Sequence, residues 1–174
     1  YPVICVEKGM LRKVFKADVT DMSEAEGAKV LSITAGTATN IVPGKAYAKV
    51  TGLSEAVIAE AAQTIENADG VKIRITSDEN DVMAIMVEGA SAHASRPHEG
   101  VNALTALVDF LSKLPLADCP STKQIRALST LFPHGIYHGE GLGIDLQDEI
   151  AGFTTVSFNI LNMDEKEICG KFDC

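Results

Sequence analysis

The feature that most constrains the fold is the order of two kinds of hydrophobic repeat along the chain. Val71, Ile73 and Ile75 alternate with polar residues, as in a half-buried β-strand, and residues 29–35, 45–51, 82–88, 154–162 and 167–174 are also strand-like. Apolar residues recur at helical spacing in residues 54–70, 101–115 and 121–132. The order β-β-α-β-β-α, followed by α-β-β, lacks the βα alternation of a doubly wound fold. We therefore predict the α+β class, with a ferredoxin-like antiparallel sheet, helices on one face, and a truncated second half of similar build.

Polar residues indicate where these elements begin and end. Ser54 stands where a cap of the first helix is expected, and Gly70 stands at its end. The spacing Ser121-x-x-Gln124 predicts a capping box for the third helix, whose inward residues would be Ile125, Leu128, Leu131 and Phe132. The polar, acidic residues 16–27 predict a loop or one short turn.

Composition limits the classes of protein and of partner. With 46% hydrophobic residues among 174, a packed core is expected, while a net charge of -9 disfavours a nucleic-acid partner. The absence of an apolar run of about 20 residues predicts that the chain does not span a membrane. The four cysteines, Cys5, Cys119, Cys169 and Cys174, are scattered, which favours free thiols in a cytoplasmic protein.

Two polar loops hold the candidate site residues. "GASAHASRPHEGVNAL" places His93 and His98 between a predicted strand and a predicted helix, where a loop tip meets solvent on a rigid base. His93 would there donate a hydrogen bond to a developing oxyanion, or else the loop is a polar connection with a neutral histidine. In "ATNIVPG", Asn40 is either a functional side chain or a turn asparagine bonded to its own backbone.

Other catalytic patterns are incomplete. His134-x-x-x-His138 has the spacing of a two-histidine metal site, but Pro133 and Gly135 argue against a helix, so a solvated loop is the favoured interpretation. The sequence has no H-E-x-x-H or G-x-S-x-G, and the glycines of "GEGLG" do not open a helix after a strand. By motif, the chain holds no complete active site.

Several segments together resemble one enzyme family. "NIVPGKAYAKV", "GASAHASRPHEGVNALTALVDFL", "LFPHG", "GIDLQDEIAGFTTVSFNIL" and "GKFDC" are similar to the dizinc dipeptidases of the aminoacylase and carboxypeptidase superfamily, in particular the Xaa-His dipeptidases. The most specific string is A-H-A-S-x-P-x-x-G-x-N-A. Because Asn40 precedes His93, the order of motifs resembles the dipeptidase branch rather than its dimeric relatives.

The resemblance implies a role for each part of the chain. Residues 1–15 correspond to the end of a catalytic-domain strand and a linker, 16–116 to a first lid subdomain, and 117–174 to part of a second. The lid closes over a catalytic domain that holds two zinc ions, whose binding motifs are not in this sequence, so the chain alone is expected to be inactive. His93 would stabilise the transition state at the scissile carbonyl of a dipeptide, and Asn40 would face the substrate. The alternative is a non-enzymatic α+β module that binds a partner protein or a small molecule.

Overall fold

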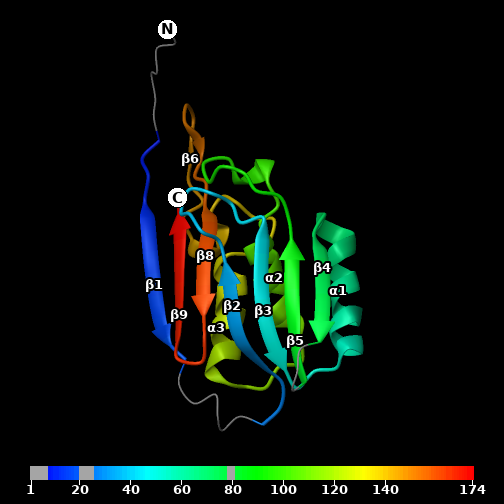
Figure 1. Ribbon diagram of the computed structural model, residues 1–174. Coiled ribbons are helices and arrows are strands. Elements are labelled where there is room, and N and C mark those ends of the chain that lie inside the picture. Colours follow the sequence, from blue (N-terminus) through cyan, green and yellow to red (C-terminus); the bar gives the residue numbers. More distant parts are fainter. Residues whose placement is uncertain (1–7, 20–25, 78–80) are drawn as a thin grey trace.

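In a computed structural model, which describes residues 8–19, 26–77 and 81–174, three helices cover one face of a seven-stranded antiparallel sheet (Figure 1). The strand order is β1-β9-β8-β2-β3-β5-β4. The strands are β1 (Arg12–Asp18), β2 (Lys29–Ala35), β3 (Lys45–Thr51), β4 (Lys72–Ser77), β5 (Val82–Glu88), β8 (Ser157–Met163) and β9 (Glu167–Asp173), and the helices are α1 (Glu55–Asp69), α2 (Ala103–Lys113) and α3 (Pro120–Leu131). The predicted α+β class is confirmed.

The first half of the chain follows the predicted elements closely. β2 and β3 form a hairpin, α1 leads to the edge strand β4, and β5 pairs antiparallel with both β4 and β3. Gly70 ends α1 in the left-handed conformation at φ 68°, as expected for a glycine after a helix. Ser54 occupies the N-cap position of α1, but its side chain makes no capping hydrogen bond.

The second half of the chain joins the same sheet. β8 pairs with β2 through Ile33, Thr34 and Ala35, and the β8–β9 hairpin continues the sheet to β1. The sheet therefore runs without a break from residues of the predicted first subdomain to those of the predicted second. The division at 116/117, which falls between α2 and α3, stays a proposal.

A β-bulge changes which residues of β8 face the core. The sequence predicts that Val156, Phe158 and Ile160 share the inward face, but the register shifts between Phe158 and Ile160. Asn159 is the extra residue at this shift, and it is fully buried together with Phe158, whereas Ile160 is only half-buried. Leu161 and Met163 are the residues that reach the core beyond the bulge. Such a bulge cannot be read from alternation, because it reverses the alternation within one strand.

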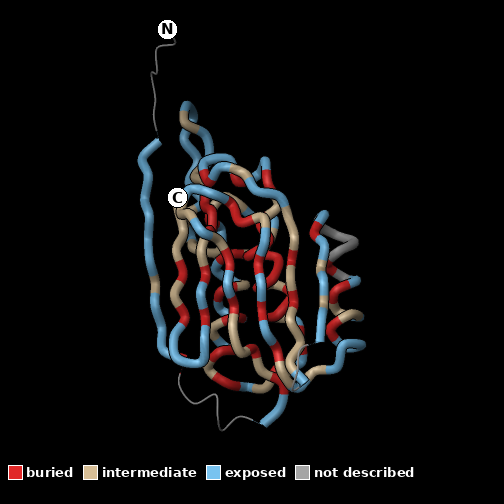
Figure 2. Tube along the Cα trace, viewed as in Figure 1, coloured by how far each residue is buried: buried red, intermediate tan, exposed pale blue. Residues whose placement is uncertain are grey.

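Three local expectations are wrong, the first of them only in part. The predicted loop at 16–27 starts too early, because residues 16–18 belong to β1, a strand whose seven residues all pair with β9 although six of them are exposed (Figure 2). Residues 20–25 of that loop lie outside the described part of the chain. Cys119 occupies the N-cap position of α3 without a capping side-chain hydrogen bond, and Pro120 begins the helix, so Ser121 is a helical residue and not the cap of a capping box. Proline suits this first position because its fixed φ matches the helix. Leu131 at the end of α3 is 39% exposed, while Ile125, Leu128 and Phe132 are buried as predicted.

The core lies between the sheet and its helices, and α2 is at its centre. Eight residues of α2 are buried, in contrast with the mostly exposed strand β1 (Figure 2). Phe15, Phe132, Phe158 and Phe172 form an aromatic cluster that ties β1, α3, β8 and β9 together, with the rings of Phe132 and Phe158 centred 4.4 Å apart. Within the part of the chain that the structure describes, no helix combines the length and the apolar character needed to cross a membrane. Residues 1–7, the first part of the segment 1–15 that the resemblance assigns to a catalytic-domain strand and a linker, lie outside the described residues.

Candidate functional site

The loop that carries His93 is closed at its neck, between β5 and α2. Ala90 and Val101 form an antiparallel bridge, in which each backbone N–H donates to the other's carbonyl at 2.9 and 2.8 Å. Glycines make this close approach possible: a Cβ on Gly89 would lie 2.2 Å from the carbonyl oxygen of Val101, and one on Gly100 would lie 2.6 Å from that of Ala90. Both distances are too short for a side chain, so the two glycines are required by the geometry of the neck.

Asn102 joins this loop to the helix and to the sheet. Its Oδ1 accepts hydrogen bonds from the backbone N–H of Leu104 at 2.9 Å and of Thr105 at 3.2 Å, which caps α2. Its Nδ2 donates to the carbonyl oxygen of Phe158 in β8 at 2.9 Å. The sequence analysis gave Asn102 no role, although an asparagine directly before a helical repeat is a known capping signal. Asn102 therefore fixes where the loop ends.

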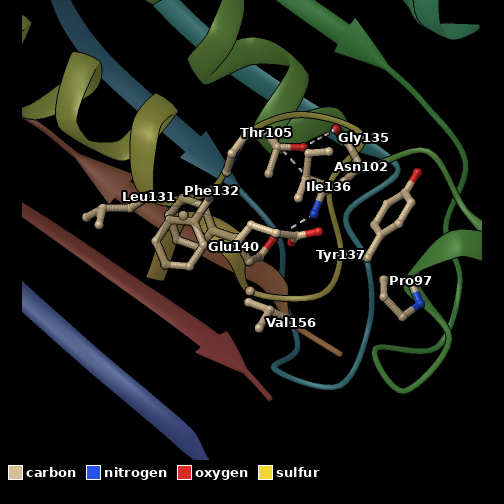
Figure 3. Close-up of a pocket in the computed structure, with 14 residues that line it drawn as sticks. Pro97, Asn102, Thr105, Leu131, Phe132, Gly135, Ile136, Tyr137, Glu140 and Val156 are labelled. Carbon is tan, nitrogen blue, oxygen red and sulfur yellow. Dashed lines mark hydrogen bonds between the residues drawn. The ribbon is translucent and has the colours of Figure 1, made fainter. Parts of the chain in front are cut away.

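A small cavity lies beside this cap (Figure 3). It is lined by Asn102 and Thr105 from the start of α2, by Phe132 and Glu140 from the segment after α3, and by Pro97 from the histidine loop. Its volume is about 20 Å³, which is room for about one water molecule and far below the several hundred Å³ of a typical ligand site. We interpret it as a small packing defect where the histidine loop contacts the segment that follows α3, and not as a ligand site.

His93 itself is exposed, and one side of its ring is fixed. Its Nδ1 accepts the backbone N–H of Ser95 at 3.2 Å and lies 2.8 Å from the Ser95 hydroxyl. A backbone N–H can only donate, so Nδ1 must be unprotonated when this bond is made, and the proton of the neutral ring is on Nε2. Nε2 has no partner among the described residues and is a hydrogen-bond donor.

Backbone pairing brings the Asn40 turn next to His93. Ile41 and His93 form an isolated antiparallel bridge, the N–H of Val42 donates to the carbonyl of Ala92 at 2.9 Å, and the N–H of Ala94 donates to that of Asn40 at 2.9 Å. The side chain of Asn40 is exposed. The two residues chosen from the sequence, which lie far apart along the chain, are thus held in adjacent backbone segments.

A buried side chain in β8 holds the Asn40 turn through a hydrogen bond to its backbone. Asn159, at the bulge of β8, donates from Nδ2 to the carbonyl oxygen of Thr39 at 2.5 Å and also accepts from the Ser157 hydroxyl. Gly36 lets the backbone of Asn159 come close to this segment, since the φ of Gly36 is 73° and a Cβ there would overlap the backbone carbonyl of Asn159. Asn159 is a positioning residue that the sequence analysis did not identify, because the bulge that buries it is a tertiary feature.

His93 lines a groove of about 540 Å³. One wall is the histidine loop, and the other is a short hairpin of β6 (Gln147–Asp148) and β7 (Gly152–Phe153), which projects at the end of the molecule where the C-terminus lies (Figure 1). At the base, Nε of Arg12 in β1 lies 3.3 Å from the Asp173 carboxylate. The groove thus offers an imidazole donor, an apolar wall and charges of both signs.

The other histidines have mainly structural surroundings. His98 is exposed in the 3₁₀ turn η2 (Pro97–Glu99). Nδ1 of His134 lies 2.8 Å from the Thr105 hydroxyl, and Nδ1 of His138 lies 3.1 Å from the carbonyl oxygen of Thr154. His134 and His138 are half-buried rather than solvated. Among residues 8–19, 26–77 and 81–174, no group of three or more His, Cys, Asp or Glu residues is arranged to hold a metal ion.

Comparison with known proteins points to peptidases. Residues 81–168, half of the chain, match the family model M20_dimer, described as a peptidase dimerisation domain. A Bacillus subtilis protein named "Putative dipeptidase YtjP" is 26% identical over 166 residues, which are 95% of this chain and 35% of that protein. "Putative dipeptidase SH1171" of Staphylococcus haemolyticus is 26% identical over 170 residues, 96% of this chain and 35% of its own length. The chain thus spans about a third of the length of the curated relatives it matches.

Proposed function

This chain belongs to the family of M20 peptidase dimerisation domains, and from that premise we propose that it is the substrate-capping lid of a zinc-dependent dipeptidase. Its partner would be the catalytic domain of the same protein, and its ligand would be a dipeptide. Support comes from the relatives named as dipeptidases, which are about three times as long as the part that they share with this chain. The alternative of a non-enzymatic module has less support, because both the family model and the relatives concern peptidases.

The proposed role of His93 is to stabilise the oxyanion of the transition state. Hydrolysis of a peptide builds negative charge on the carbonyl oxygen, and a preorganised donor aimed at that oxygen lowers the barrier. The observation that carries the proposal is the hydrogen bond from the Ser95 N–H to Nδ1. It leaves the proton of the neutral ring on Nε2, on a side chain that lines an open groove. His93 can therefore donate without first being protonated.

Two further parts of the site complete the proposal. Asn40 would contact the substrate, since its turn is paired to the His93 segment and its side chain is exposed. Two zinc ions in the catalytic domain would activate the attacking water and polarise the carbonyl. The lid's own residues would orient the peptide and exclude water when the lid closes. We place the protein in the cytoplasm, which agrees with the free thiols of Cys119, Cys169 and Cys174.

The test is substitution of His93 in the full-length protein that contains this chain. His93→Ala is expected to lower kcat on dipeptides about 100-fold, the loss typical of one oxyanion donor, with an unchanged thermal unfolding midpoint because the ring is exposed. His98→Ala, which removes the other exposed histidine of the same loop, is the matched control and is expected to keep its activity. A kcat/KM for His93→Ala within twofold of the unmodified enzyme would exclude the role. The 174-residue chain alone is expected to show no peptidase activity in the same assay.

A further inference from the structure

The wall of the groove opposite His93 exposes apolar side chains. Leu146 and Phe153, from the β6–β7 hairpin, are 70% and 45% exposed, and Met10 nearby is 65% exposed. All three line the groove together with His93. Single exposed apolar residues are common, but large ones grouped around a groove are typical of a surface that binds something.

The Phe153 ring is held in place without being covered. It lies against the imidazole of His138, with ring centroids 4.8 Å apart. His138 is in turn fixed by the contact of its Nδ1 with the Thr154 carbonyl oxygen at 3.1 Å, and the Thr154 N–H donates to the carbonyl of Leu146 at 2.8 Å. One face of Phe153 is therefore supported while much of the ring stays open to the groove. An aromatic side chain preorganised in this way loses little conformational freedom when a ligand packs on it.

The charges around the groove match a small zwitterion. Arg12 contacts Asp173 through Nε, and at the hairpin the Asp148 carboxylate accepts the N–H groups of Ile150 and Ala151 at 2.9 and 2.7 Å. A short peptide with free ends carries one ammonium and one carboxylate, and the groove is lined by groups of both signs, Lys8 and Arg12 together with Asp148 and Asp173. The volume of about 540 Å³ also falls in the range of sites for small ligands.

We infer that this groove is a substrate subsite for short peptides with a bulky apolar side chain, which packs against Phe153 and Leu146. The inference rests on the proposed function, because it places the scissile bond of the same peptide near His93. It adds a preference for substrates: dipeptides with a large apolar residue are bound more tightly than those built of glycine.

Binding to the 174-residue chain tests the subsite without any catalysis. The ¹⁵N-labelled chain is titrated with Leu-Leu and, separately, with Gly-Gly, and amide shifts are followed by NMR. Leu-Leu is expected to shift the amides of Ala94, Ser95 and residues 151–155 at concentrations where Gly-Gly does not. Phe153→Ala is expected to weaken Leu-Leu binding about fivefold or more, the order expected when part of an aromatic contact is lost. Leu146→Ser serves as a second variant, expected to act in the same direction.

A matched control is available outside the groove. Tyr47 in β3 is an aromatic residue with 46% exposure, against 45% for Phe153, and it does not line the groove. Tyr47→Ala should leave Leu-Leu binding as in the unmodified chain. The subsite would be overturned if Phe153→Ala and Leu146→Ser both bound Leu-Leu with unchanged affinity. Equal amide shifts with Leu-Leu and with Gly-Gly would overturn it as well.

Activity of the full-length protein separates this inference from the role of His93. Phe153→Ala is expected to lower the ratio of kcat/KM for Leu-Leu over Gly-Gly about fivefold through KM, in line with the binding loss. His93→Ala is expected to lower kcat for both dipeptides and to leave the ratio unchanged. An active His93→Ala would exclude the role proposed for His93, while the NMR result would still decide the subsite. Equal losses for both dipeptides in Phe153→Ala would refute the subsite and indicate that the hairpin contacts the rest of the protein.

Discussion

The histidine loop, residues 89–102, and the β6–β7 hairpin face each other across one groove but are held in opposite ways. The loop is closed by the Ala90–Val101 bridge, by two glycines without room for a side chain, and by the buried cap Asn102. The hairpin has strands of two residues each, and Leu146, Ile150 and Phe153 at or near it are exposed. The difference teaches that most residues of the histidine motif serve to fix the position of one exposed ring. The apolar side chains of the hairpin, in contrast, contribute little to packing within the described chain.

The largest expected effect on stability is at Asn102. Asn102→Ala removes two capping bonds and leaves the carbonyl of Phe158 without its side-chain donor, so we expect a loss of about 3 kcal/mol in the free energy of unfolding. For a chain of this size that lowers the thermal midpoint by about 6–12 °C. Asn102→Ser, which keeps a capping oxygen but is too short to reach Phe158, should lose about half as much. A midpoint for Asn102→Ala within 2 °C (about 1 kcal/mol) of the unmodified chain would show that the loop is not held by this cap.

A pair of glycine substitutions sharpens the contrast. Gly100→Ala places a Cβ against the Ala90 carbonyl in the neck of the loop, and we expect it to cost about 2 kcal/mol. Gly152→Ala meets no neighbouring atom but forces an alanine to a φ of 78°. We expect a hairpin with strands of only two residues to open locally without global unfolding, so the cost of Gly152→Ala should stay below about 1 kcal/mol. Urea unfolding of both variants measures the difference, and equal losses would contradict the idea that the two regions are held differently.

The smallest expected effect is a pH dependence confined to the hairpin. Hydrogen bonds from the N–H groups of Ala151 and Ile150 hold the pKa of Asp148 below its ordinary value of 3.8. A carboxylate with a pKa lowered by folding stabilises the structure above its unfolded pKa, and this contribution is lost as the pH falls through the lowered value. Acidification below the ordinary value should therefore lower the hydrogen-exchange protection of the Ile150 and Ala151 amides, measured relative to their intrinsic exchange rates at the same pH.

Asp164 provides the internal control for this titration. Its carboxylate accepts the N–H groups of Glu167 and Lys166, which likewise lower its pKa, but it sits in the turn between the long strands β8 and β9. Its titration is not expected to open the β8–β9 pairing. If exchange protection in β8 and β9 were lost at the same pH as in the hairpin, the β8–β9 turn would be held no more firmly than the β6–β7 turn, and the contrast between them would fail.

Much of the fold could be predicted because it depends on local patterns. Alternation identified β4, helical spacing identified α1 and α2, and Gly70 marked the end of α1 as the structure has it. β1 was missed because an exposed edge strand has no apolar face of its own and forms only by pairing with β9. The capping box at Ser121 failed because Pro120 begins α3 one residue earlier.

The candidate site was predictable only in part. His93 and Asn40 could be named from the loops that hold them, and the pairing of Ile41 with His93 shows that these loops lie together. Their functional roles stay predictions. Asn159 could not be named, since a polar residue inside a predicted strand gives no sign that a bulge will bury it under the Asn40 turn.

The sequence by itself determined the class of fold, most of the helices and strands, and the position of the histidine between a strand and a helix, because these follow from contacts between residues close along the chain. Only the tertiary structure decided that the last two strands join the first sheet, that Asn40 lies beside His93, and that a hairpin with exposed apolar side chains completes the groove. These features depend on hydrogen bonds and packing between distant segments, which no local pattern specifies.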